Sequence, residues 1–310
     1  MKIAFVFPGQ GSQSVGMMKS FAGLPGIRDT FGEASSAIGQ DLWQLVEAGP
    51  AEELNLTVNT QPVMLAASVA LHRAWNASTG VRPMISAGHS LGEYSALVAG
   101  GAINFADAVA LVRFRAQAMQ EAVPAGVGAM AAILGLEDDV VRTICKEVSG
   151  PNGIVEAANF NSPTQVVIAG NAAAVERAME AAKGKGAKRA IMLPMSVPSH
   201  CSLMRPAAEL MRERLKIVTI GTSSLPVLHN ADVSNADSAD AVRDALVRQL
   251  YQPVRWVDTI RAIVSAGATH IVECGPGRVL AGLNKRIAPE TRTLSFGDEP
   301  AFKEALAMLK

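Results

Sequence analysis

Cysteine is scarce in this sequence of 310 residues. Only three occur, Cys145, Cys201 and Cys274, and they lie far apart, with no Cys-x-x-Cys pair and no cluster of cysteine with histidine. This spacing argues against a structural zinc site, and the small number indicates a reducing compartment. We therefore expect no metal in this protein.

Excess charge of one sign and aromatic side chains are also lacking. Lysine plus arginine and aspartate plus glutamate both number 28, and aromatic residues make up 5% of the chain. A nucleic-acid-binding surface carries a basic excess, and a platform that stacks on bases needs aromatic rings. The sequence thus predicts no nucleic-acid partner and no general attraction to acidic membrane surfaces.

Long hydrophobic runs are missing as well. The apolar run at residues 3–7 is broken by Pro8 and is too short for the core of a secretory signal. No stretch of about 18 apolar residues occurs, so we expect no membrane partner and a cytoplasmic location. What the chain does have is 49% hydrophobic residues against 18% charged ones, enough for a large buried core and more than one lobe.

Short apolar segments alternate with longer helical patterns over much of the chain, which is typical of an α/β protein with a parallel sheet. Segment 61–75 and the segment from Leu91 to the glycine pair at 100–101 are predicted helices. A third helix is predicted from the N-cap Asn104 to Pro124. Strands are predicted at residues 3–7, 84–87, 225–230, 270–274 and 291–296.

The pattern changes between residues 125 and 194. The predicted order there is strand, helix, two strands around the turn Asn161-Ser162-Pro163, helix and strand, which is the split β-α-β pattern of a ferredoxin-like unit. We therefore predict a large, discontinuous α/β lobe made of residues 1–124 and 195–310. Residues 125–194 are predicted to form a small, ferredoxin-like α+β lobe inserted into it.

The stretch Gly88-His89-Ser90-Leu91-Gly92 stands between a predicted strand and a predicted helix. In a G-x-S-x-G turn of this kind the serine occupies a tight elbow, and its hydroxyl stands clear of the sheet. The glycines are needed because neighbouring chain approaches closely and the turn is strained. The alternative is an ordinary glycine-rich turn, since the pattern alone occurs often by chance. The strand–turn–helix context favours a catalytic Ser90.

A serine hydroxyl is a weak nucleophile and needs a base within hydrogen-bond reach. His72 lies in an apolar helix and is interpreted as structural, and His89 adjoins the serine on the elbow, so its ring is expected to point elsewhere. The residue order of hydrolases with this elbow favours a late histidine, whereas loops at lobe junctions commonly carry catalytic groups. The residues alone leave three candidates for the base open: His200, His229 and His270.

Three further positions have both a chemical and a structural interpretation. The corner FPGQGSQSVG resembles a dinucleotide-binding fingerprint, but Ser14 stands where the third glycine belongs, and we favour a strand end that presents Gln10 and backbone N–H groups to an oxyanion. Arg115, inside a helix, is either a solvated surface residue or a ligand for a substrate carboxylate. Cys201 is interpreted as a core residue and not as the nucleophile.

Six motifs occur in order across nearly the whole chain: FVFPGQGSQ, GHSLGEYSALVAGG, FRAQAMQ, NFNSPTQVVIAG, PMSVPSHCSLM and ECGPGRVL. In this order and spacing they resemble the malonyl-CoA:acyl carrier protein transacylases of bacterial type II fatty acid synthesis. The resemblance implies a hydrolase-like parallel-sheet core with a ferredoxin-like insertion. It also implies an acyltransferase that moves a malonyl group from malonyl-CoA to the phosphopantetheine thiol of acyl carrier protein, without a metal or redox cofactor. By analogy of fold we expect a monomer.

The resemblance also assigns roles to individual residues. It implies that Ser90 is the nucleophile, that His200 is the base and that Arg115 holds the free malonyl carboxylate. Supporting positions implied by the same motifs are the backbone N–H donors at Gln10 and Leu91, the histidine-orienting carbonyl at Gln249 and the site-lining Gln61.

Two other functions remain open from the sequence. A serine thioesterase or esterase would use the same elbow with water as the acceptor of the acyl group, and a non-catalytic carrier-binding module would form no acyl-serine at all. The basic cluster within residues 183–189 is either a solvated face or a surface for an acidic partner protein.

Overall fold

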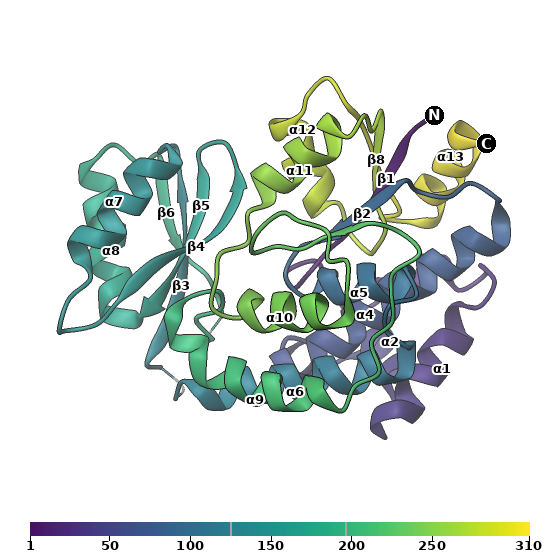
Figure 1. Ribbon diagram of the computed structural model, residues 1–310, viewed down its shortest axis with the longest axis horizontal. Coiled ribbons are helices and arrows are strands. Elements are labelled where there is room, and N and C mark those ends of the chain that lie inside the picture. The colour runs from purple at the N-terminus through teal and green to yellow at the C-terminus, as the bar shows by residue number, and fades with distance from the viewer. Residues whose placement is uncertain (125, 196) are drawn as a thin grey trace.

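The computed structural model describes residues 1–124, 126–195 and 197–310. Figure 1 shows a larger part built around a parallel sheet and a smaller part built around an antiparallel one. Ala125, the first residue of the predicted small lobe, lies outside the described residues, as does Ser196 in the loop before His200.

A five-stranded sheet forms the centre of the larger part, and each neighbouring pair of strands is parallel. Its order is β7 (Val227–Leu228), β2 (Ile85–Gly88), β1 (Ile3–Phe7), β8 (His270–Glu273) and β9 (Arg292–Ser295). All of β1 is buried, as expected of a parallel strand covered on both faces. The predicted parallel α/β core is thus confirmed. β7 is shorter than predicted because the chain turns at His229, whose N–H donates to the carbonyl of Ser234.

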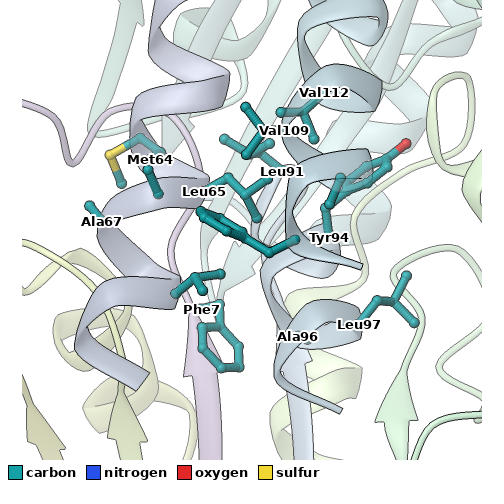
Figure 2. Close-up of a cluster of buried hydrophobic side chains, with 14 of the residues drawn as sticks. Phe7, Met64, Leu65, Ala67, Leu91, Tyr94, Ala96, Leu97, Val109 and Val112 are labelled. Atoms are coloured by element: carbon teal, nitrogen blue, oxygen red, sulfur yellow. The ribbon is translucent and has the colours of Figure 1, made fainter. Parts of the chain in front are cut away.

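Helices cover both faces of this sheet. One face is covered by α4 (Thr57–Ser78), α5 (Gly92–Ala99) and α6 (Phe105–Ala122), and the other by α11 (Trp256–Ser265) and α12 (Val279–Ile287). Successive residues of a strand point to opposite faces. Phe5 and Phe7 accordingly pack with the first group of helices, and Ala4 and Val6 with the second. Figure 2 shows Phe7 among side chains of α4 and α5.

The helices begin and end close to the predicted positions. Asn104 caps α6, and its side-chain oxygen accepts a hydrogen bond from the N–H of Ala106. Helix α4 begins at Thr57, four residues before the prediction, so Pro62 lies in its second turn. Within the described residues, every helix falls short of the length and apolar character needed to cross a bilayer. The larger part also contains α1 (Ile27–Ile38), α2 (Leu42–Ala48), α3 (Ala51–Leu54), α9 (Arg205–Lys216), α10 (Ala239–Gln249) and α13 (Glu299–Leu309), with 3₁₀ turns at Lys19–Phe21 and Ser202–Met204.

The smaller part is a four-stranded antiparallel sheet with two helices on one face. Its elements follow the predicted order: β3 (Gly128–Leu134), α7 (Asp138–Val148), β4 (Val155–Ser162), β5 (Gln165–Asn171), α8 (Ala172–Gly184) and β6 (Arg189–Met192). The spatial order β4-β5-β3-β6 is that of a ferredoxin-like unit. The hairpin turns at Pro163 and Thr164, not at the predicted 161–163. Thr164 takes the positive φ of 66° that the turn requires, and Asn161 therefore stays in the strand.

Candidate active site

The elbow after β2 is as tight as the glycine spacing predicts. Ser90 has a φ of 52°, a left-handed conformation that side chains with a Cβ rarely adopt. A Cβ on Gly88 would lie 1.9 Å from the carbonyl carbon of Gly92, and a Cβ on Gly92 would lie 2.0 Å from the carbonyl oxygen of Phe7. Backbone occupies both spaces, so only glycine fits. The strained turn lifts the Ser90 hydroxyl out of the sheet.

His200 is in hydrogen-bond contact with that hydroxyl. Its Nε2 lies 2.7 Å from Oγ of Ser90, and its Nδ1 lies 2.8 Å from the carbonyl oxygen of Gln249. A carbonyl only accepts, so the ring carries its proton on Nδ1 and turns the Nε2 lone pair toward the serine. Burial of the ring, together with the positive charge of Arg115, lowers the pKa of His200 to about 3. The imidazole is therefore neutral and able to accept a proton at ordinary pH.

The other two candidate bases are occupied elsewhere. His229 is bound through Nδ1 to the Glu93 carboxylate at 2.7 Å. His270 pairs with Ile3 at the start of the parallel strands, whereas the elbow follows their other end, where Gly88 pairs with Phe7. The sheet thus separates His270 from Ser90.

Three side chains assigned structural roles from the sequence behave accordingly. His72 contacts Asn76, and the ring of His89 points away from the serine to Oδ1 of Asn161 at 2.8 Å. Cys201 is fully buried, and burial raises the pKa of its thiol to about 12. A thiol with so high a pKa is not a nucleophile at neutral pH.

Arg115 is buried and not solvated. It is 1% exposed, and its guanidinium donates to Oε1 of Gln61 at 2.9 Å and to Oε1 of Gln249 at 3.0 Å. Nη2 also lies 3.4 Å from Oγ of Ser90. Burial lowers the pKa of Arg115, but a guanidinium remains charged in proteins. Its partners here are neutral, so its positive charge is available to an anion beside the serine.

The loop after β1 lies directly against the elbow. A Cβ on Gly9 would lie 2.6 Å from the carbonyl oxygen of His89 and 3.8 Å from the backbone nitrogen of Leu91. This close approach brings the backbone at Gln10 beside that at Leu91. Across residues 1–124, 126–195 and 197–310, neither of these two N–H groups donates to a protein acceptor. Two unused donors beside a serine hydroxyl can receive an oxyanion.

A cavity of about 140 Å³ opens above the serine, between the two sheets. A second cavity of about 420 Å³ shares Gln10, Leu193 and Met195 with it, so the two adjoin. The first cavity has the following lining: Gln10, His89, Ser90, Met130, Asn159, Asn161, Val167, Leu193, Met195, Ser199 and His200. In the described part of the chain, no three His, Cys, Asp or Glu side chains are grouped so as to hold a metal ion.

Comparison with known proteins places the chain in a family. Residues 4–287 match the model of the acyl transferase domain. The chain belongs to the acyl transferase family. It is 55% identical to the malonyl CoA-acyl carrier protein transacylase of Salmonella typhimurium over 301 residues, and this aligned region covers 97% of both chains. The resemblance drawn from the motifs is thereby confirmed.

Solved structures of relatives agree with this assignment. The acyl-carrier-protein S-malonyltransferase of Burkholderia pseudomallei has a TM-score of 0.97 and 57% identity over 99% of this chain and all (100%) of that one. A malonyl-transacylase solved in complex with a type II PKS acyl-carrier protein has a TM-score of 0.98 and 51% identity, over 99% of this chain and 100% of its own. The acyl transferase fold expected from the sequence is confirmed.

Two polar residues of this acyl transferase, Asn230 and Glu93, are not among the site residues predicted from the sequence. Oδ1 of Asn230 accepts from the N–H of Ser90 at 2.7 Å, and its Nδ2 donates to the carbonyl of Gly88 at 2.6 Å, so one amide holds both sides of the elbow. Glu93 is fully buried one turn after the serine. A lone acidic residue in the apolar segment EYSALVAG was the available signal for Glu93. Asn230 stands in a strand-like run and gives no such signal.

Proposed function

We propose that this acyl transferase moves the malonyl group of malonyl-CoA to the phosphopantetheine thiol of acyl carrier protein, as a step of fatty acid synthesis. The observation that carries the proposal is the position of Arg115. Its charge is buried next to Oγ of Ser90, and the hydrogen-bond partners that the described residues give it, Gln61, Gln249 and Ser90, are neutral. An acyl group that ends in a free carboxylate is the substrate that such a cation selects.

In the first half of the proposed reaction, the serine is acylated. Nε2 of His200 takes the proton of the Ser90 hydroxyl as Oγ attacks the thioester carbon. The N–H groups of Gln10 and Leu91 receive the negative charge that develops on the carbonyl oxygen. The carbon–sulfur bond then breaks, CoA leaves with the proton from His200, and a malonyl-serine ester remains.

The second half runs the same steps with a different thiol. The phosphopantetheine thiol of acyl carrier protein gives its proton to His200 while its sulfur attacks the ester carbon. Ser90 leaves and takes the proton back, so the enzyme is regenerated. Gln249 serves both halves because its carbonyl keeps the proton of the imidazole on Nδ1.

Arg115 links substrate choice to the strength of the base. Its positive charge contributes to the depressed pKa of His200. A malonyl carboxylate bound to the guanidinium cancels this charge and makes the imidazole more basic at the moment when it must take a proton. An acetyl group leaves the charge uncompensated and the base weak. Preference for malonyl is thus expected in the rate as well as in binding.

Intact-mass analysis after mixing the protein with malonyl-CoA tests this function. We expect a malonyl adduct on the wild-type chain and none on Ser90→Ala. A carrier-binding module without catalytic activity would gain no malonyl mass. When radiolabelled malonyl-CoA and acyl carrier protein are supplied together, label on the carrier supports transfer, and label released as free malonate supports a thioesterase.

The proposal also covers cofactors, lobe organisation, cellular location and oligomeric state. The proposed steps use only side chains and backbone N–H groups, so we infer that no metal or cofactor takes part. We further infer that residues 126–194 act as an inserted lobe, because their β-sheet and helices form a hydrophobic cluster of their own. Three free, buried thiols fit a cytoplasmic enzyme, and we propose that it works as a monomer.

A further inference from the structure

A buried acid–imidazole pair lies beside the site, and none of the steps above uses it. Glu93 is in the first turn of α5, His229 directly follows β7, and their side chains are 0% and 2% exposed. Oε1 of Glu93 lies 2.7 Å from Nδ1 of His229. The other carboxylate oxygen accepts from the N–H of Asn230 at 2.9 Å and from Nε2 of Gln249 at 3.0 Å. A buried carboxylate is tolerated when it is satisfied in this way.

Gln249 connects this pair to Arg115. Nε2 of Gln249 donates to Glu93 and also, at 2.9 Å, to the carbonyl of Ser90. Both partners only accept, so the amide is held with its oxygen on the opposite side, where it faces the donor-only guanidinium at 3.0 Å. A flipped amide would set acceptors against acceptors and donors against donors. Glu93 therefore orients the group that holds Arg115, and a single amide separates the two charges.

The sign of the charge on this pair matters to a substrate with a carboxylate. A negatively charged Glu93 beside a neutral His229 would offset the charge of Arg115 and would repel a second negative group nearby. Burial acts to lower the pKa of His229, but the charge and the hydrogen bond of Glu93 outweigh it, and the pKa is raised. Asp232 acts in the same direction as Glu93, and Arg248 acts against it.

We propose that Glu93 and His229 together set the preference for malonyl over acetyl groups: Glu93 orients Gln249 toward Arg115, and His229, with Nδ1 2.7 Å from Glu93, carries a proton that cancels the charge of Glu93. Arg115 then remains the net charge of the pocket and keeps its attraction for the substrate carboxylate. Both are positioning residues, since they act through Gln249 and Arg115. The inference rests on the proposed malonyl transfer.

The test compares acylation of Ser90 in the full-length chain by malonyl-CoA and by acetyl-CoA, as the ratio of the two kcat/KM values. His229→Gln keeps a donor toward Glu93 but removes the positive charge. As a general scale, two unit charges on the order of 10 Å apart at an effective dielectric constant of about 20 change a binding constant by about tenfold. We expect kcat/KM for malonyl-CoA to fall by about this factor, mainly through KM. The value for acetyl-CoA should stay within about twofold.

A second variant separates charge from packing. Glu93→Gln combined with His229→Gln removes both charges, while the amide oxygen at 93 can still accept from Asn230 and Gln249. We expect this double variant to recover the malonyl preference to within about threefold of wild type. His72→Gln is the matched control, because it removes another buried histidine, one that is hydrogen-bonded to Asn76 and packed against Phe5 and Phe7. It should leave the ratio unchanged.

Three results would overturn the inference: an unchanged ratio in His229→Gln, an equal loss for both substrates, and no recovery in the double variant. Because both substrates are measured on one preparation, a partly folded variant still yields a ratio. His229→Asn removes the same charge with less bulk and is the second choice if His229→Gln does not fold. Failure of the proposed function is a different outcome, since the wild-type protein itself would then take up no malonyl group.

Discussion

Replacement of Arg115 by alanine is the most direct test of how the site chooses its substrate. The guanidinium is buried and already placed by two amide oxygens, so it offers a carboxylate preorganised donors with little loss of entropy. A bidentate contact consists of two charge-assisted hydrogen bonds, each worth about 1.5–3 kcal/mol. Loss of about 3–6 kcal/mol corresponds to a fall of roughly 10²–10⁴ in kcat/KM for malonyl-CoA.

Acetyl-CoA should respond in the opposite way to Arg115→Ala. The variant no longer has a buried cation without a counter-charge, and His200 is no longer weakened by that cation. The rate of serine acylation by acetyl-CoA should therefore stay the same or rise. The ratio of malonyl to acetyl rates then falls both because the malonyl reaction is slower and because the acetyl reaction is not. Stopped-flow or quenched acylation of Ser90 with each thioester measures the two rates.

A matched control lies on the same helix. Arg113, two residues before Arg115, contacts Gln40 on the far side of α6 from the serine and is only partly buried. Arg113→Ala should keep the malonyl preference within about threefold, since a residue two positions away points roughly to the opposite side of an α-helix. If Arg115→Ala retained the wild-type ratio of malonyl to acetyl rates, or if both rates fell together, the assignment of Arg115 as the carboxylate ligand would be refuted.

Three further predictions concern stability and reactivity. Burial, with the charges of Arg82 and Arg73, lowers the pKa of His72 to about 4. Below pH 6.5 the unfolded chain therefore binds a proton at His72 that the folded chain does not, so the free energy of unfolding falls by about 3 kcal/mol as the pH approaches 4. In urea unfolding, the free energy of unfolding of His72→Gln should fall less between pH 7 and pH 4.5 than that of the wild type. Equal losses in the two proteins would count against this. Cys201→Ala should keep acyl transfer, and iodoacetamide should not inactivate the wild type, because the thiol is buried with a pKa raised to about 12; rapid inactivation protected by malonyl-CoA would contradict it. Gly92→Ala should abolish soluble, active protein, since its Cβ would meet the carbonyl oxygen of Phe7 at 2.0 Å; an active variant would show that the elbow can relax.

The sequence predicts the fold more fully than the site. Apolar runs bounded by glycine and proline mark the parallel strands, and the β-α-β-β-α-β order marks the small sheet, because both signals are local. The proposed base, in contrast, is not marked by any local pattern in the sequence. His200 lies 110 residues after Ser90, and the choice among three histidines depends on which end of the sheet each one occupies. Only the resemblance of whole motifs singled out His200 in advance.

Arg115 shows the limit of helical periodicity. It stands among apolar neighbours on α6, and periodicity alone does not say whether that turn is solvated or covered. Packing of α6 against α4 and the C-terminal end of α10 decides the matter by bringing Gln61 and Gln249 onto the guanidinium. The three residues come from separate helices, so no window of the sequence contains the site.

The strain in the two reacting residues explains why so many polar groups converge here. Ser90 and His200 both have a positive φ, of 52° and 64°, which is unfavourable for residues with a Cβ. Such conformations persist only where neighbours hold them on several sides. The N–H of Ser90 is held by Asn230 and its carbonyl by Gln249, while the N–H of His200 donates to Leu250 and its ring to the carbonyl of Gln249. Because Gln249 holds both strained residues and Arg115 as well, the proposed nucleophile, base and substrate-selecting charge all depend on one side chain and its peptide. A change that shifts the end of α10 is therefore expected to disturb all three together.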